Sequence, residues 1–117
     1  MKKIYYLSSC DTCRRILRDI GTESELILQD IGAEPLSADQ LDGLRRLAGS
    51  YEALINKRAR LYIQRGLKDK GLSEADFRAL LLEHYTFLKR PVILAGGKIF
   101  IGNAPKTAAA AREALHS

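Results

Sequence analysis

The sequence predicts an α/β fold in which a strand–helix–strand unit is followed by a helical middle segment, a β-hairpin and a last helix. Three observations predict it. A short aromatic and β-branched run leads into an amphipathic helical pattern near the start of the chain. Residues 37–88 carry helix-type periodicity throughout. Near the end, Gly96-Gly97 separates two β-rich runs.

The first strand is predicted at residues 3–7, which end at a serine pair. A helix is expected to begin at Cys10 or Asp11 and to end at Gly21. Residues 25–29 form the second predicted strand, and the helix that crosses between the strands makes them parallel. The apolar positions of this helix follow the i, i+3, i+4, i+7 spacing of one buried stripe: Cys13, Ile16, Leu17 and Ile20.

Residues 37–88 are predicted to be helical. Ser37 and Gln40 form a capping-box pattern before the first helix, whose apolar face includes Leu41, Leu44 and Leu47. Residues 51–55 are predicted to begin a short second helix, and a further helical turn is expected at residues 61–63. Ser73 is the expected N-cap of a further helix. The apolar face of that helix is predicted to consist of Phe77, Leu80, Leu81, His84 and Tyr85, which makes His84 a core or edge residue.

The hairpin is predicted from residues 92–95 and 98–101, and the last helix covers residues 105–115 with Pro105 near its first position. This order of elements is thioredoxin-like, with an all-helical insertion. We expect a single domain over residues 1–117, with residues 1–36 and 88–117 forming the thioredoxin-like part and residues 37–87 the insertion. Pro91 lies where such folds place a cis-proline facing the redox cysteine.

Both cysteines lie in one C-x-x-C motif, Cys10 and Cys13, where the first strand leads into the helix. The N–H groups and dipole at a helix start favour an anion, and Arg14 and Arg15 are expected to add positive potential, so Cys10 is the candidate nucleophile. Cys13 lies one turn later and is the candidate resolving thiol. The alternative is that Cys13 is a small core residue and Cys10 an incidental loop thiol. Arg90 is predicted to present donors to an oxyanion or thiolate, or else to be a solvated surface arginine.

The composition of the chain favours some kinds of binding partner over others. The 19 Lys+Arg exceed the 14 Asp+Glu, a formal charge of +5 that suits anionic small molecules or acidic proteins. Because this excess is spread over several helices without a nucleic-acid motif, direct nucleic-acid binding is not expected. No apolar run approaches a membrane span, so we expect a cytoplasmic protein without membrane contact, in which a disulfide would be transient. Two cysteines without further ligands do not predict a zinc site or any bound cofactor.

The chain resembles the glutaredoxin-linked arsenate reductases and the related Spx-type regulators. The resemblance covers nearly the whole sequence and rests on residues 4–10, 54–58 and 88–93. It implies that Cys10 is the nucleophile and that Arg90 precedes the proline of the site. It also implies glutathione or glutaredoxin as the external reductant. The candidate binding residues around the catalytic set of Cys10, Cys13 and Arg90 are Ser9, Asp11, Thr12, Arg14, Asn56, Arg58 and Pro91.

The departures from the family pattern concern the oxyanion site. Arsenate reductases of this kind have a histidine four residues before the cysteine and three arginines, whereas this chain has Tyr6 at the histidine position and Asn56 and Ile101 at two arginine positions. Because each charge-assisted contact is worth roughly 1.5–3 kcal/mol, arsenate binding is expected to be weakened severely. Cys13 instead resembles the second cysteine of Spx-type regulators, which bind RNA polymerase.

Three functions follow from these residues. The first is a thiol-disulfide oxidoreductase acting on a glutathione adduct, disulfide or oxyanion. The second is an Spx-like redox switch that binds RNA polymerase. The third is glutaredoxin-dependent arsenate reduction.

Overall fold

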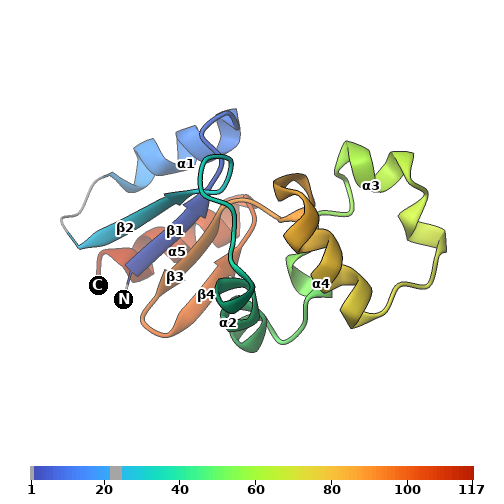
Figure 1. Cartoon of the computed structure of the whole chain (residues 1–117). Helices are drawn as coiled ribbons and strands as arrows, with labels where there is room; N and C mark the ends of the chain where they lie inside the picture. The colour runs from blue at the N-terminus through green and yellow to red at the C-terminus, as the bar shows by residue number, and fades with distance from the viewer. Residues whose placement is uncertain (1, 22–24) are drawn as a thin grey trace. The chain divides into compact units, whose positions relative to one another are not determined.

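The computed structural model describes residues 2–21 and 25–117, and the elements follow one another in the predicted α/β order (Figure 1). They divide into two compact units. One contains the chain up to Glu34 together with Arg90–Ser117, and the other contains Pro35–Lys89. Within the described residues, no helix has both the length and the apolar character needed to cross a membrane.

The first unit is built on a four-stranded sheet in the order β2-β1-β3-β4. Strand β1 (Lys2–Tyr6) pairs in parallel with β2 (Leu26–Asp30), which confirms the predicted strand–helix–strand unit. Both strands are offset by one residue from their predicted bounds, because the register pairs Lys2 with Leu26 and Tyr6 with Asp30. The offset leaves Leu7 in the loop that leads to the cysteine motif.

The hairpin of β3 (Val92–Ala95) and β4 (Lys98–Ile101) has the predicted bounds, and β3 lies antiparallel to both β1 and β4. Gly96 and Gly97 both adopt positive φ angles, of 59° and 75°, as a two-residue hairpin turn requires. Pairing with β1 places the residues that precede β3 at the same end of the sheet as the end of β1.

Helices α1 (Asp11–Ile20) and α5 (Pro105–Leu115) supply the core of this unit. The predicted stripe of α1 is confirmed, since Cys13, Ile16 and Ile20 are buried, while Leu17 is half-buried. Alanine side chains on α5 allow close packing. The core cluster consists of Ile4, Ile16, Ile20, Ile93, Ala95, Ala111 and Leu115.

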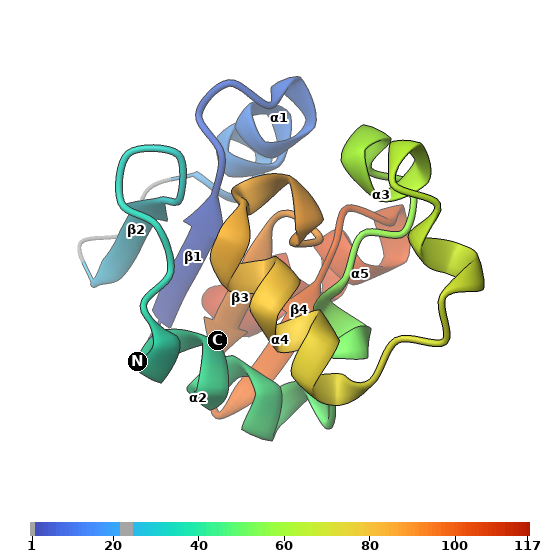
Figure 2. The same cartoon turned by 45° about the vertical axis from the view of Figure 1, so that its right-hand side comes forward.

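The second unit contains α2 (Ala38–Ala48), α3 (Arg60–Gln64) and α4 (Glu74–Glu83), and α4 lies between α2 and α3 in both views (Figures 1 and 2). Both predicted helix starts are confirmed, because Ser37 and Ser73 each form a complete capping box. The connections include three short 3₁₀ turns, labelled η1 (Glu52–Leu54), η2 (Leu67–Asp69) and η3 (Tyr85–Phe87).

Three details of the helical prediction are wrong. The segment predicted as a short helix at residues 51–55 is the 3₁₀ turn η1. His84 ends α4 and is exposed, because the chain leaves the helix there with an extended backbone and its ring accepts a hydrogen bond from the Thr86 N–H. Leu47 keeps 47% of its surface exposed, so the buried face of α2 is limited to Leu41 and Leu44.

A short ladder closes the second unit. The Asn56 N–H donates to the Phe87 carbonyl at 2.7 Å, and the Lys89 N–H donates to the Leu54 carbonyl at 2.8 Å. An antiparallel bridge between Ile55 and Leu88 lies between these two hydrogen bonds. The residues that follow η1 are therefore fastened to the last residues of this unit, directly before Arg90.

Candidate redox site

Cys10 is the N-cap residue of α1, as the sequence predicted. Its backbone is extended (φ −92°, ψ 115°), its N–H donates to the Leu7 carbonyl at 3.0 Å, and its carbonyl accepts the Arg14 N–H at 3.1 Å. The Cys10 thiol is half-buried. The thiol therefore lies beside the unpaired N–H groups of the first helical turn.

The surroundings of Cys10 favour its thiolate. Burial opposes ionisation, but it is outweighed by hydrogen bonds from the backbone N–H and thiol of Cys13, by the charge of Arg90 and by the Thr12 N–H. The pKa of Cys10 is therefore lower than that of an ordinary thiol. Such a thiol attacks sulfur or oxyanion substrates more readily at neutral pH.

The pKa of Cys13 is shifted in the opposite direction, upward. It has no exposed surface, and its pKa is raised to about 11, chiefly by this burial and against a weaker opposing effect of a backbone hydrogen bond from Leu7. The Cys10 thiolate contributes to this rise through its hydrogen bond with the Cys13 thiol and through its negative charge. The two thiols thus differ as an attacking and a resolving cysteine must.

Arg90 and Pro91 join this site from the start of β3. The Arg90–Pro91 peptide bond is cis, as predicted, and Pro91 is almost completely buried. Arg90 is half-buried, and its positive charge lowers the pKa of both thiols. The tertiary fold therefore brings the predicted catalytic arginine to the cysteine pair.

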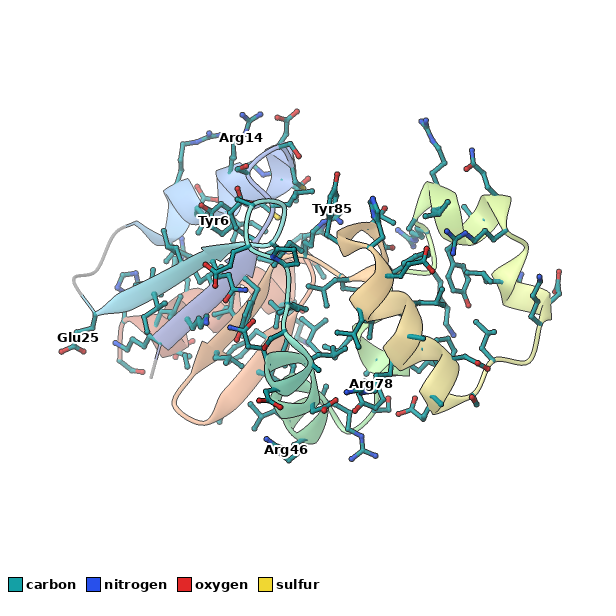
Figure 3. All side chains as sticks on the ribbon, in the orientation of Figure 1. Tyr6, Arg14, Glu25, Arg46, Arg78 and Tyr85 are labelled. Atoms are coloured by element: carbon teal, nitrogen blue, oxygen red, sulfur yellow. The ribbon has the colours of Figure 1, made fainter. Side chains whose placement is uncertain are left out.

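The other predicted residues of the motif lie in different surroundings. Thr12 is half-buried in the first turn, and Ser9 is exposed. The expected contribution of Arg14 and Arg15 to the Cys10 pKa needs correction, because the cation that acts there is Arg90. Arg14 instead forms an exposed ion pair with Asp11 and projects from α1 (Figure 3).

Asn56 and Arg58 belong to the second unit. The Asn56 side-chain oxygen accepts a hydrogen bond from the Arg58 N–H at 3.1 Å and shapes the turn before α3. Arg58 is exposed, and Asn56 is half-buried. Their predicted part in binding stays a prediction.

One residue that shapes the cysteine loop was missed by the sequence reading. Asp30, at the end of β2, accepts hydrogen bonds from the Ser8 N–H at 3.2 Å and the Gly32 N–H at 3.1 Å. The side chain of Ser8 is the largest cause of the lowered Asp30 pKa, together with these two N–H groups. An acidic residue at the end of a parallel strand, at the edge where the β1 loop also leaves the sheet, was the available signal.

No three His, Cys, Asp or Glu residues cluster in a way that could hold a metal ion in the part of the chain that the structure describes. The residues that the structure brings together at this site are two thiols and an arginine.

A family comparison agrees with this geometry. The model of the ArsC family matches residues 5–111. The chain belongs to the ArsC family. It is similar to the uncharacterised protein YfgD of Escherichia coli, with 29% identity over 109 residues that cover 89% of this chain and 90% of the relative. The global transcriptional regulator Spx of Bacillus subtilis is 24% identical over 104 residues, which cover 87% of this chain and 79% of Spx.

Among solved structures, an arsenate reductase from Vibrio cholerae superimposes with a TM-score of 0.76 at 21% identity and covers 97% of both chains. This likeness confirms the predicted thioredoxin-like fold. The membership of the ArsC family confirms the resemblance that the sequence motifs indicated.

Proposed function

We propose that this ArsC-family protein is a thiol-disulfide oxidoreductase in which Cys10 attacks and Cys13 resolves. The observation that supports this most directly is the opposite direction of the two pKa shifts, lowered at Cys10 and raised to about 11 at Cys13. A reducing compartment such as the cytoplasm would keep the pair ready to react.

The reaction proceeds in two exchanges. The Cys10 thiolate attacks one sulfur of a substrate disulfide, such as a glutathione mixed disulfide, and forms a new sulfur–sulfur bond while the other substrate sulfur leaves as a thiolate. The Cys13 sulfur then attacks the Cys10 sulfur, and the bond between Cys10 and the substrate breaks. The proton of the Cys13 thiol passes to the substrate thiolate that leaves. The substrate disulfide gains two electrons from the protein, and the protein is left with a Cys10–Cys13 disulfide. Glutathione or glutaredoxin would then reduce this disulfide.

The environment of Cys13 suits this order of events. Its high pKa keeps it protonated while Cys10 is free, and part of that shift comes from the Cys10 thiolate itself. Once Cys10 enters a mixed disulfide, its negative charge disappears, and the pKa of Cys13 falls. The resolving thiol is therefore activated by the first step, while the charge of Arg90 continues to favour its thiolate.

Glutathione disulfide and mass spectrometry provide the test. Reduced wild-type protein is expected to form the intramolecular disulfide, whereas a Cys13→Ser variant should accumulate a stable glutathione adduct on Cys10. A Cys10→Ser variant should remain unmodified at neutral pH, because Cys13 is buried and protonated. Adduct formation on Cys13 in that variant, or a wild-type protein without the intramolecular disulfide, would contradict the proposal.

Two other functions, arsenate reduction and an Spx-like redox switch, can be distinguished from the proposed one by separate assays. Arsenate reduction coupled to glutathione and glutaredoxin is expected to stay at background, because Asn56 and Ile101 replace arginines of the family pattern. Full arsenate turnover by Cys13→Ser would favour a single-cysteine reductase instead. The similarity to Spx favours a redox switch as the second candidate. Recovery of RNA polymerase with only one redox state of this protein would support that candidate.

A further inference from the structure

The excess positive charge of the chain is concentrated in one short segment of the second unit. Residues 57–70 contain six cationic residues and one acidic residue, a net charge of +5 that equals the formal charge of the whole protein. The expectation that the excess is spread over several helices is therefore wrong. The cations are Lys57, Arg58, Arg60, Arg65, Lys68 and Lys70, and the acid is Asp69.

In the folded protein, the cationic side chains of residues 57–70 are exposed to solvent. Ala59, Tyr62 and Leu67 are buried and attach the segment to the second unit, whereas all six cationic residues are exposed. We call the exposed part of residues 57–70 the basic surface. Figure 3 shows nitrogen-tipped side chains projecting from the ribbon around α3.

Only part of this charge is neutralised within the chain. Lys57 pairs with Glu52 at 2.5 Å, and Arg65 pairs with Glu83 at 2.6 Å. The other four cations form no ion pair with an acidic residue in the ranges 2–21 and 25–117: Arg58, Arg60, Lys68 and Lys70.

An apolar side chain lies within the basic surface. Ile63 exposes 66% of its surface, more than any of the other exposed large apolar residues described in the chain. Arg60 and Ile63 are three residues apart on α3 and therefore lie on the same side of that helix. An apolar centre with a polar rim is the usual composition of a protein–protein contact.

We propose that the basic surface binds an acidic segment of a partner protein that presents an apolar side chain to Ile63. Charge complementarity would guide the encounter, and Ile63 would add affinity by burying apolar area. Two other anionic partners fit less well. The one aromatic residue of the segment, Tyr62, is buried and cannot stack on a base, and one exposed isoleucine is too little to enter a lipid layer.

This proposal goes beyond the thiol chemistry, and the test separates the two by using both wild-type and Cys10→Ser protein. The probe is a short fluorescent peptide of Asp and Glu with a central Leu, measured by anisotropy. A peptide with Ser at the central position, a duplex DNA, and vesicles of phosphatidylcholine with phosphatidylserine serve as comparison probes. Equal peptide binding by the two proteins shows that binding does not depend on Cys10.

Charge-reversal variants test the position of the surface. Arg60→Glu/Lys68→Glu/Lys70→Glu is expected to weaken binding of the acidic peptide at least about tenfold. The matched control, Lys98→Glu/Lys106→Glu/Arg112→Glu, makes the same change in net charge on exposed residues of the first unit and should weaken binding no more than about twofold by loss of long-range attraction. Thermal melts verify that both variants fold.

A second pair of variants tests the apolar centre. Ile63→Ser should weaken binding of the Leu peptide about three- to fivefold and leave binding of the Ser peptide unchanged. Leu47→Ser, at another exposed apolar residue of the second unit, should change neither. Equal losses in the two charge variants, absence of peptide binding, or tighter binding of DNA or vesicles that depends on the same residues would each overturn the proposal.

Discussion

At the scale of single residues, the environment gives two chemically identical thiols different roles. Cys10 is half-buried at a helix start and receives hydrogen bonds from two backbone N–H groups, whereas Cys13 is fully buried in the stripe of α1. Arg90 acts on both from the residues that precede β3, a distant part of the sequence. The reactivity of this pair therefore depends on one turn of helix and on one residue next to the start of a strand.

The first prediction concerns the charge of Arg90. An Arg90→Gln variant should have a higher Cys10 pKa than the wild type, because a cation that stabilises the thiolate has been removed. The pH dependence of alkylation by iodoacetamide measures this pKa in a Cys13→Ser background. Arg15→Gln is the matched control and should leave the alkylation profile in place, since Arg15 is an exposed residue of α1.

The second prediction concerns stability at alkaline pH. The folded-state pKa of Cys13 is raised to about 11, so the unfolded chain releases this proton first as pH rises above about 9. The contribution of the protonated Cys13 is complete below that pH and is lost by about pH 11, which amounts to about 2–3 kcal/mol.

Denaturant unfolding under reducing conditions checks this prediction. The difference in unfolding free energy between wild type and Cys13→Ala should shrink by that amount between about pH 9 and pH 11. A difference that stays constant over this range would show that Cys13 ionises as easily in the folded protein as in the unfolded chain.

At the scale of elements, a carboxylate connects two helices of the second unit. Asp42 on α2 accepts two hydrogen bonds from Arg78 on α4, at 2.9 and 3.2 Å, and one from the Tyr51 hydroxyl at 2.5 Å. Arg78 is seen on α4 beside α2 in Figure 3. Hydrogen bonds from Arg78 and then Tyr51 lower the Asp42 pKa to about 2. The connection between α2 and α4 is therefore acid-sensitive.

The third prediction follows from this pKa. Asp42→Asn should lower the melting temperature at neutral pH, because Arg78 and Tyr51 lose a charged acceptor. The contribution of Asp42 is present above the ordinary carboxyl pKa of about 4 and is lost as pH falls to about 2, so the wild-type and variant melting temperatures should converge there. Asp69→Asn, at an exposed acid of the same unit, should show no such convergence.

At the scale of the whole molecule, the chain is divided between a sheet unit that carries the thiols and a helical unit that carries the basic surface. Chemistry and the proposed partner binding are thus assigned to different units. The sheet unit depends on a small core in which isoleucines from β1, α1 and β3 meet alanines from β3 and α5.

The fourth prediction contrasts this core with the surface of the same sheet. Ile4→Ala should reduce the free energy of unfolding by about 2–5 kcal/mol, because Ile4 is fully buried. Ile27→Ala, on the neighbouring strand with 47% of the side chain exposed, should cost less than about 1 kcal/mol. Chemical denaturation of both variants measures the difference, and equal costs would contradict the assignment of Ile4 to the core.

The sequence by itself determined the order of the elements, the helix starts at Ser37 and Ser73, the hairpin at Gly96-Gly97 and the position of Cys10. These features depend on neighbouring residues: on periodicity, on capping side chains and on the conformational freedom of glycine. Only the tertiary structure decided which cation acts on Cys10, that Asp30 holds the cysteine loop, and that Ile63 lies exposed among cations. Charge interactions and burial depend on residues that lie far apart in the chain but close together in space. A local sequence pattern cannot show which of these residues meet.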